Sequence, residues 1–488
     1  MEASAGPSGG NRKLDLIDGP ISRTLLLFAL PTLGSNVLQS LNGSINAIWI
    51  GQFLGESALA AAANANLIMF LMFSGVFGFG MAATVLIGQF AGRRDIDGVR
   101  RVMGTVTGIF LSFSIAIALL GWIFAPAILR LLGTPADVFP LALDYLRVIF
   151  LAMPPVFMMV LLMMALRGVG DAMTPLWFMG VAVLFDMSFN PLLILGIGPF
   201  PELGIKGSAA AALIANSVSL AALLFTVYRR DLVVRLRGAE WRYLRPDPTI
   251  LRPILAKGLP MGLQMFLASV AGMAMMGLVN RHGTSTVAAY GAANQLWTYI
   301  MMPAMAVGAA VSAMAAQNIG AGRWDRIPAI ARAGIVNVLV ITGTMVLILA
   351  AIDLYALGLF LPRDPGTLRL ASHINLVVSW SFVVFGIMMI FGAVVRANGA
   401  VFVPLILMAI AFFPIRLGFA VAFTPRLGPD AIWWSFPLGF VAGTLLTWSY
   451  YRFGRWREAK LMSLPSIEEV QEEALASGEP AGRFQPTV

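Results

Sequence analysis

The chain consists of long apolar stretches separated by short polar segments. Each stretch has about 20 residues or more, the length that an α-helix needs to cross the hydrocarbon core of a bilayer. None alternates apolar and polar residues over short runs, as the strands of a membrane barrel do. The pattern predicts twelve transmembrane helices, at residues 21–49, 57–88, 103–128, 142–165, 174–198, 207–228, 258–280, 285–315, 333–361, 371–394, 402–424 and 431–451.

Composition supports an all-α membrane protein. Hydrophobic residues make up 59% of the 488 residues and charged residues only 12%, whereas soluble globular chains carry about 25% charge. Helices also satisfy every backbone polar group internally, as lipid requires. The chain has no cysteine, which excludes disulfides and thiol chemistry. Residues 1–20 lack the continuous apolar core of a cleavable signal peptide, so we expect the first span to act as the anchor.

The basic residues predict the orientation in the membrane. The net charge of +9 lies in loops between apolar spans, which argues against a nucleic-acid partner. With the N-terminus inside, 25 of the 33 lysines and arginines fall in inside segments and seven in outside segments, and Arg416 alone lies within a span. This asymmetry follows the positive-inside rule. It predicts a multi-pass protein of the bacterial inner membrane with both termini cytoplasmic.

Two halves of the chain repeat each other. Matching residues lie 228 or 229 positions apart over some 145 residues, as in Asn66 and Asn294, Gln89 and Gln317, Gly92 and Gly320, Arg167 and Arg396, and Pro175 and Pro404. Because the matched basic loops lie on one side, each half crosses the membrane an even number of times. The fold class is therefore twelve helices in two parallel-repeat six-helix bundles, with a substrate cavity between the halves.

The repeat also predicts the domain organisation. We expect a cytoplasmic N-terminus at 1–20, one bundle at 21–228, a basic linker at 229–257, a second bundle at 258–455 and a tail at 456–488. The linker carries tryptophan and tyrosine anchors and predicts a helix lying at the cytoplasmic membrane surface. The tail is acidic and polar, a composition typical of disorder.

Two pairs of loops resemble those of a known transporter family. GQFAGRRD at 88–95 and AAQNIGAGRWD at 315–325 resemble the paired glutamine–glycine signature of the multidrug and toxic compound extrusion (MATE) transporters, and LRGVGDAMTP at 166–175 and VRANGAVFVP at 395–404 resemble that family's second repeated loop. The resemblance covers about residues 20 to 455 and is nearest to the bacterial DinF-like type. It implies a V-shaped pair of bundles that exchanges an organic, often cationic, compound for protons or sodium.

The fifth predicted span contains a carboxylate in its middle. Asp186 lies in AVLFDMSFNPLLILG, and Asn190 follows one helical turn later on the same face. Charge inside a bilayer is costly, so an acidic residue there is a candidate functional site. Burial favours the protonated carboxyl group, which can then bind and release a proton near neutral pH. The resemblance implies cation coupling at this turn, although the family's order of asparagine and acid is inverted here. A hydrogen-bonded structural aspartate is the alternative.

Amide side chains line one face of the first predicted span: Asn36, Gln39, Asn42 and Asn46. The family places an aspartate where Asn46 stands, and its absence leaves Asp186 as the main titrating group. The amides either coordinate a cation or join helices by hydrogen bonds. Gln39 and Asn42 are also candidates for the wall of the substrate cavity. Sodium would draw on Asp186, Asn190 and Asn46. The family's hydroxyl residue of the sixth span has no match near Ala212, so protons are favoured over sodium.

Several other residues have two interpretations each. Pro31 is expected to act as a hinge in the first span, or as a static kink. Five polar or aromatic residues of the second half are candidates for the cavity wall or for packing: Gln264, Asn294, Gln295, Trp297 and Tyr299. Arg416 either faces a cavity or is satisfied by snorkelling or a carbonyl partner.

Taken together, these patterns predict a secondary active antiporter that exports organic, cationic, multidrug-type compounds in exchange for protons. A sodium-coupled exporter of the same fold and a lipid-linked precursor flippase are the alternatives; a flippase would have more spans and a more basic cavity. We expect no enzyme activity, because no nucleophile–base pair or metal constellation can be assembled. His282 and His373 lie 91 residues apart without metal-ligand spacing. The expected partners are a small organic substrate and the lipid bilayer, with the chain as a monomer, no cofactor and no bound metal.

Overall fold

The computed structural model describes residues 15–361 and 365–459, leaving aside the side chains of Leu67 and Leu71. Across these ranges the secondary structure is helical, and no β-strand occurs. They contain twelve helices, some of them interrupted, that are long and apolar enough to cross a membrane. The predicted all-α fold and the predicted number of spans are therefore confirmed.

Each of the first six spans is one continuous helix. Their bounds are α1 Ile21–Leu54, α2 Glu56–Gly92, α3 Ile96–Leu131, α4 Phe139–Gly168, α5 Met173–Leu195 and α6 Ile205–Arg229. The turns that join them use glycines with positive φ at Gly55, Gly170 and Gly196, a conformation that residues with a Cβ seldom adopt. Helices α5 and α6 pack side by side, and α4 packs against both α2 and α6.

The last six spans are more interrupted. Their elements are α7 Pro248–Asn280, α8 Thr284–Gly320, η2 Trp324–Arg326, α9 Ile327–Ala351, α10 Asp353–Gly358, α11 Pro365–Val378, α12 Ser381–Ala397, α13 Phe402–Ile410, η3 Ala411–Leu417, α14 Gly418–Leu427 and α15 Asp430–Phe453. Helices α11 and α12 form the tenth span. The eleventh consists of α13, η3 and α14, and η3 is a π-helical turn.

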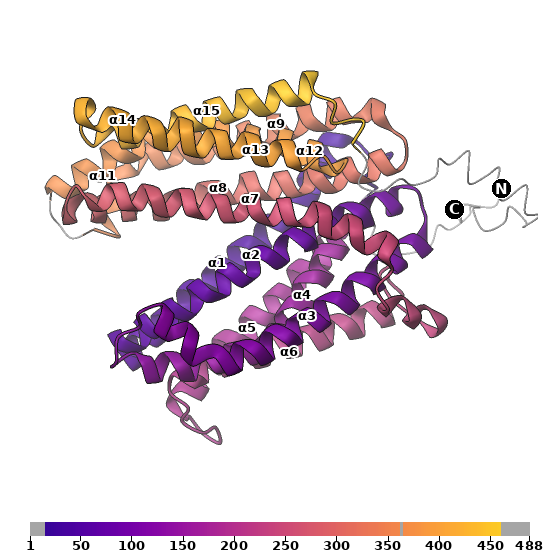
Figure 1. Ribbon diagram of the computed structural model, residues 1–488, viewed down its shortest axis with the longest axis horizontal. Helices are drawn as coiled ribbons and strands as arrows, with labels where there is room; N and C mark the ends of the chain where they lie inside the picture. The colour runs from indigo at the N-terminus through magenta and orange to yellow at the C-terminus, as the bar shows by residue number, and fades with distance from the viewer. Residues whose placement is uncertain (1–14, 362–364, 460–488) are drawn as a thin grey trace, which may run out of the picture.

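The two sets of helices form two arms that diverge from one end of the molecule. Figure 1 shows α1 to α6 in the indigo-to-magenta arm and α7 to α15 in the red-to-yellow arm, and the start of α1 and the end of α15 lie where the arms meet. We call this the joined end. Contacts between the arms are made by α2 with α7 and α8, and by α1 with α8 and α9.

Close approach of α2 and α7 explains the glycine-rich segment at 75–80. A Cβ on Gly78 would lie 2.3 Å from the backbone nitrogen of Gly262 and 2.4 Å from the carbonyl oxygen of Gly258. No side chain fits there, so the glycines allow the two helix backbones to touch. The segment thus packs helices together, as its position inside a predicted span indicates.

At the joined end the two halves exchange equivalent hydrogen bonds. The Gln89 side chain of α2 donates to the carbonyl oxygen of Ala397 at 2.8 Å, and the Gln317 side chain of α8 donates to the carbonyl oxygen of Gly168 at 2.9 Å. Both glutamines are buried. The loops that carry the repeated glutamine–glycine motif therefore bind each half to the other, which gives the motif a structural reason.

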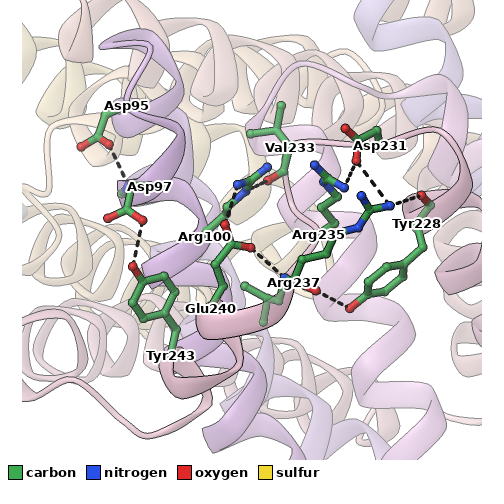
Figure 2. Close-up of polar contacts among 12 residues, drawn as sticks. Asp95, Asp97, Arg100, Tyr228, Asp231, Val233, Arg235, Arg237, Glu240 and Tyr243 are labelled. Carbon is green, nitrogen blue, oxygen red and sulfur yellow. Dashed lines mark hydrogen bonds and ion pairs between the residues drawn. The ribbon is translucent and has the colours of Figure 1, made fainter. Parts of the chain in front are cut away.

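The linker differs from its prediction. No helix runs through 229–257; instead residues 238–244 form a short 3-10 helix, η1, and α7 begins at Pro248. Figure 2 shows why: polar side chains fold the segment back onto α3, where Arg100 forms an ion pair with Glu240 at 2.6 Å and Tyr243 donates to Asp97 at 2.8 Å. Specific polar contacts with α3 thus replace the regular amphipathic helix that composition predicted.

Both ends of the described chain pack at the joined end. The Asn318 side chain donates to the carbonyl oxygen of Leu16 at 2.9 Å, and Arg326 donates to that of Gly19 at 2.7 Å. Residues 15–20, which we call the N-terminal strap, thus contact the second half before continuing into α1. Residues 456–459, assigned to the tail, include the buried Trp456; the expected disorder of the remaining tail falls on residues outside the described ranges.

Candidate coupling site in the N-terminal half

Helix α5 presents Asp186 and Asn190 on its buried face. Their side chains are 3% and 1% exposed, and their spacing of four residues places them one above the other. Helix α1 packs against α5 and brings Asn42 and Asn46 to the same place. The structure therefore joins the fifth-span carboxylate and two amides of the first-span stripe, Asn42 and Asn46, into one cluster.

Asp186 is held by a neutral donor. The Asn42 side-chain amide donates a hydrogen bond to Oδ2 of Asp186 at 2.8 Å, and this is the one hydrogen bond that Asp186 receives within residues 15–361 and 365–459. Its Oδ1 atom is enclosed without a partner there. A buried carboxylate normally pairs with a cation because desolvation destabilises its charge. Asp186 lacks such a pair in the described chain, so a proton or a small cation is needed to neutralise it.

Asn190 and Asn46 form a second layer one turn away. Asn190 donates to Oδ1 of Asn46 at 3.0 Å, and the Ser208 hydroxyl of α6 donates to the same oxygen at 2.6 Å. The Tyr145 side chain of α4 is 3% exposed, interacts with Ser208 and Asn46, and lies near Asp186. Four helices thus meet at this cluster, which we call the coupling site.

Two members of the coupling site were not found from the sequence. The sixth span was judged to lack a hydroxyl near Ala212, yet Ser208, one turn earlier, supplies one. Its position in GSAAAAL, four residues before Ala212 and on the same helix face, was the available signal. Tyr145 gave no signal, because aromatic residues at helical spacing are ordinary in apolar spans.

Three buried oxygen atoms of the coupling site accept no hydrogen bond from the described residues. They are Oδ1 of Asp186, Oδ1 of Asn42 and Oδ1 of Asn190. Oxygen atoms of this kind are ligands for a hard cation, and one of them can carry a proton. The arrangement can therefore bind a proton, or a cation shared between α1 and α5.

Pro31 lies inside α1 and is buried, 15 residues before Asn46. Hydroxyl groups bond to carbonyl oxygens beside it: Thr32 donates to Phe28 at 3.1 Å and Ser35 donates to Pro31 at 3.0 Å. The hinge remains a prediction. Bending at Pro31 would move the part of α1 that follows it, which carries Asn42 and Asn46.

The predicted cavity residues differ in exposure: some are exposed, some are half-buried, and some are held by contacts with neighbouring residues. Gln39 and Asn294 are exposed, and Gln295 and Tyr299 are half-buried. The Gln264 amide donates to the carbonyl oxygen of Val401 at 3.4 Å and accepts from Arg396 at 3.4 Å, which ties it to neighbouring helices.

Trp297 does not line a cavity. Its side chain is 1% exposed, and its indole N–H donates to Oδ1 of Asn375 at 3.0 Å. The Asn375 amide in turn donates to Asp353 at 2.5 Å. Trp297 is therefore a packing residue of the second half, which is one of the two interpretations that the sequence left open for it.

Comparison with known proteins agrees with this geometry. A family model, MatE, matches residues 31–192 and again residues 260–422. The chain is 33% identical over 444 residues to the probable multidrug resistance protein YoeA of Bacillus subtilis (strain 168), an alignment that covers 91% of this chain and 96% of that protein. It is 27% identical over 382 residues to an FAD transporter of Shewanella oneidensis, covering 78% and 83%.

A solved structure supports the fold. A multidrug resistance MATE family transporter in its outward-facing conformation superposes with a TM-score of 0.84 at 19% identity, covering 93% of this chain and 99% of that one. The two family matches begin 229 positions apart and end 230 positions apart, which agrees with the repeat found in the sequence. The chain therefore belongs to the MATE family of multidrug efflux transporters and is a multi-pass membrane protein.

Proposed function

We propose that this chain is a secondary active antiporter, not an enzyme, that exports organic compounds, cationic ones among them, in exchange for protons. The observation that carries the proposal is the environment of Asp186, a carboxylate that is 3% exposed and bonded to one neutral amide. A charge held there without a cation is costly, so the group is poised to take up a proton.

The hydrogen bond between Asn42 and Asp186 suggests how the proton acts. It joins α1 to α5 at 2.8 Å, and a bond to an ionised acceptor is about twice as strong as a bond to a neutral one. Protonation of Asp186 from the outside therefore weakens the link, and α1 can bend at Pro31 and displace the compound outward. Release of the proton to the cytoplasm restores the link and the affinity for the next compound.

Coupling requires the proton and the compound to favour different states of the same bundle. The charge asymmetry of the loops supports an inner-membrane location with the joined end in the cytoplasm, since the positive-inside rule places basic loops there. In that orientation the diverging arms of Figure 1 open outward. We expect the chain to work as a monomer.

Sodium is the second candidate for the coupling ion, and one observation favours it. The three unpartnered oxygens of the coupling site come from residues on two helices, as the ligands of a shared cation do. Sodium usually takes about six oxygens, by analogy with other hard cations. The described residues offer fewer unpartnered side-chain oxygens here, so we favour the proton.

The test is export of the organic cation ethidium from vesicles, with pH and sodium gradients imposed separately. We expect the pH gradient alone to drive export by the wild type and the Asp186→Asn variant to lose it. Asp353→Asn is the matched control, because Asp353 is a buried carboxylate, 5% exposed, in the other half; that variant should keep export. Full pH-driven export by Asp186→Asn would refute the assignment, and export driven by sodium alone would select sodium.

A further inference from the structure

The eleventh span is the repeat counterpart of α5, and its buried residues match those of α5. Buried residues of the two spans first occur 229 positions apart, in the pairs Pro175 and Pro404, Ala182 and Ala411, and Val183 and Phe412. Beyond these the buried pairs are 230 positions apart, in Asp186 and Arg416 and in Asn190 and Ala420. A π-helical turn accommodates one extra residue, and η3 lies where the spacing changes.

Arg416 is therefore the repeat counterpart of Asp186. The first half holds a buried acid at this position, and the second half holds a buried base. The amides that accompany Asp186 have no polar counterpart: the positions 229 residues after Asn42 and Asn46 are Ala271 and Met275, both buried and apolar. The second half has thus kept the place of the charge and reversed its sign.

Aromatic rings surround Arg416. Its guanidinium carbon lies 3.5 Å from the ring centroid of Phe436, and 5.8 Å and 5.7 Å from those of Phe412 and Phe440. The phenol of Tyr290 is the titratable group that faces it. Snorkelling does not apply, since Arg416 is 6% exposed.

The charge of Arg416 has no counterion in the described chain. None of the ion pairs within residues 15–361 and 365–459 includes it, and its Nε atom is enclosed without a hydrogen-bond partner there. Stacking on a ring offsets only part of the cost of burying a charge. A buried, unpaired arginine inside a membrane bundle is a candidate binding site for an anion that the described residues do not supply.

We propose that Arg416 and its rings bind the anionic group, a carboxylate or a phosphate, of an aromatic compound that the protein exports. The inference rests on the proposed transport function and assigns a substrate class to the second half. A guanidinium matches the two oxygens of such a group with paired N–H donors. Tyr290 lies one turn of α8 from the exposed Asn294, and we expect the compound to enter from that side when the helices around Arg416 move.

The two halves then bind groups of opposite charge. The coupling site of the first half takes up a cation, the proton, and the Arg416 site of the second half takes up an anion. Compounds that carry a negative group beside a ring system would use the second site, whereas purely cationic compounds would not.

Two flavins make a matched pair of probes. Riboflavin is neutral, and flavin mononucleotide has the same ring system with a phosphate added. Their fluorescence reports binding to the full-length protein in nanodiscs at one fixed pH without any gradient. We expect the wild type to bind flavin mononucleotide about 10- to 100-fold more tightly than riboflavin, the gain typical of a desolvated charged hydrogen bond.

The variants separate the charge from the packing. Arg416→Met removes the charge and keeps an unbranched apolar side chain, and it should bind flavin mononucleotide no more tightly than riboflavin. Arg416→Lys keeps the charge without the paired donors and should retain part of the preference. Equal binding of the two flavins by the wild type, or an undiminished preference in Arg416→Met, would overturn the proposal. The wild-type comparison decides it even if the methionine variant does not fold.

The proposed function can fail separately. Asp186→Asn should keep the wild-type flavin preference while losing pH-driven export. Loss of the preference in Asp186→Asn would contradict the claim that the coupling site and the Arg416 site are independent. Retained export by that variant would count against the proton assignment and leave the Arg416 site untouched.

Discussion

Replacing Gly320 with alanine should open the joined end. A Cβ at Gly320 would lie 2.0 Å from the carbonyl oxygen of Gln89, and a Cβ at Gly92 would lie 2.0 Å from that of Gln317. Since the obstacle in each case is backbone, the ends of α2 and α8 must separate by about 1 Å to reach even the tightest contact seen for real Cβ atoms.

The cost can be estimated from what that separation breaks. Both reciprocal glutamine bonds, at 2.8 and 2.9 Å, would lengthen beyond a useful distance, at about 1 kcal/mol each. Overpacking adds about 1 kcal/mol or more. A total of about 3 kcal/mol shifts the equilibrium between the joined and separated states roughly 100-fold toward separation.

Thiol labelling can measure the shift because the chain has no native cysteine. Ser312→Cys is conservative, and Ser312 is 6% exposed. It lies one turn before Ala316, whose Cβ faces Gly88 of the other half. A membrane-impermeant maleimide applied on the side of the joined end should label this cysteine about 100-fold faster in Gly320→Ala, in proportion to the separated population.

The matched control is Gly343→Ala in α9, since a Cβ at Gly343 meets nothing within 4 Å. It should leave labelling unchanged. If Gly320→Ala also labels at the wild-type rate and transports normally, the contact between Gly92 and Gly320 does not hold the halves together, and the reasoning is wrong.

Three further predictions concern single contacts. Ser208→Ala removes the hydroxyl that bonds to an α1 amide at 2.6 Å; pH-driven export in vesicles should fall about 3- to 10-fold with folding intact, and unchanged export would place Ser208 outside the coupling site. Trp297→Phe leaves Oδ1 of Asn375 without its donor, so thermal unfolding in detergent should show a loss of about 1–2 kcal/mol; no loss would mean that the bond contributes nothing. The hydrogen bond from the Thr249 hydroxyl, above all, holds the pKa of Asp247 below its usual range. The ionised form therefore stabilises the first turn of α7 above the unfolded pKa of about 3.9 and loses this effect as pH falls through the lower folded value; hydrogen exchange should show acid-induced opening of that turn in the wild type and none in Asp247→Asn.

The fold was predictable because lipid restricts the choices. Apolar runs of spanning length must be helices, and the constant spacing of residues such as Gln89 and Gln317 reveals two halves in the same orientation. The interruptions were less predictable. The π-helical turn at 411–417 depends on one extra residue, which shifts the spacing by a single position within an apolar span and leaves its hydropathy unchanged.

The residues of the candidate site could be predicted where their type is rare inside a membrane span. They could not be predicted where their type is common there. Asp186 stands out because an acid inside lipid is costly, and the amides of α1 stand out by their periodicity. Ser208 and Tyr145 do not, since serine and tyrosine occur in membrane helices for many reasons. The sequence could not decide between cavity lining and packing for Trp297 for a related reason, because helical spacing fixes the face of a residue only within about a turn, and the ring can lie on either side.

The N-terminal strap limits how the segment before α1 can vary in length. Its bonds to Asn318 and Arg326 use backbone carbonyl oxygens of Leu16 and Gly19, so these two contacts depend on the length of the strap. Inserting or deleting a residue between Leu16 and the start of α1 would either detach the segment or pull on the helix that carries Asn42 and Asn46. The strap therefore holds α1 to the opposite arm, and its length limits how far the two can move apart.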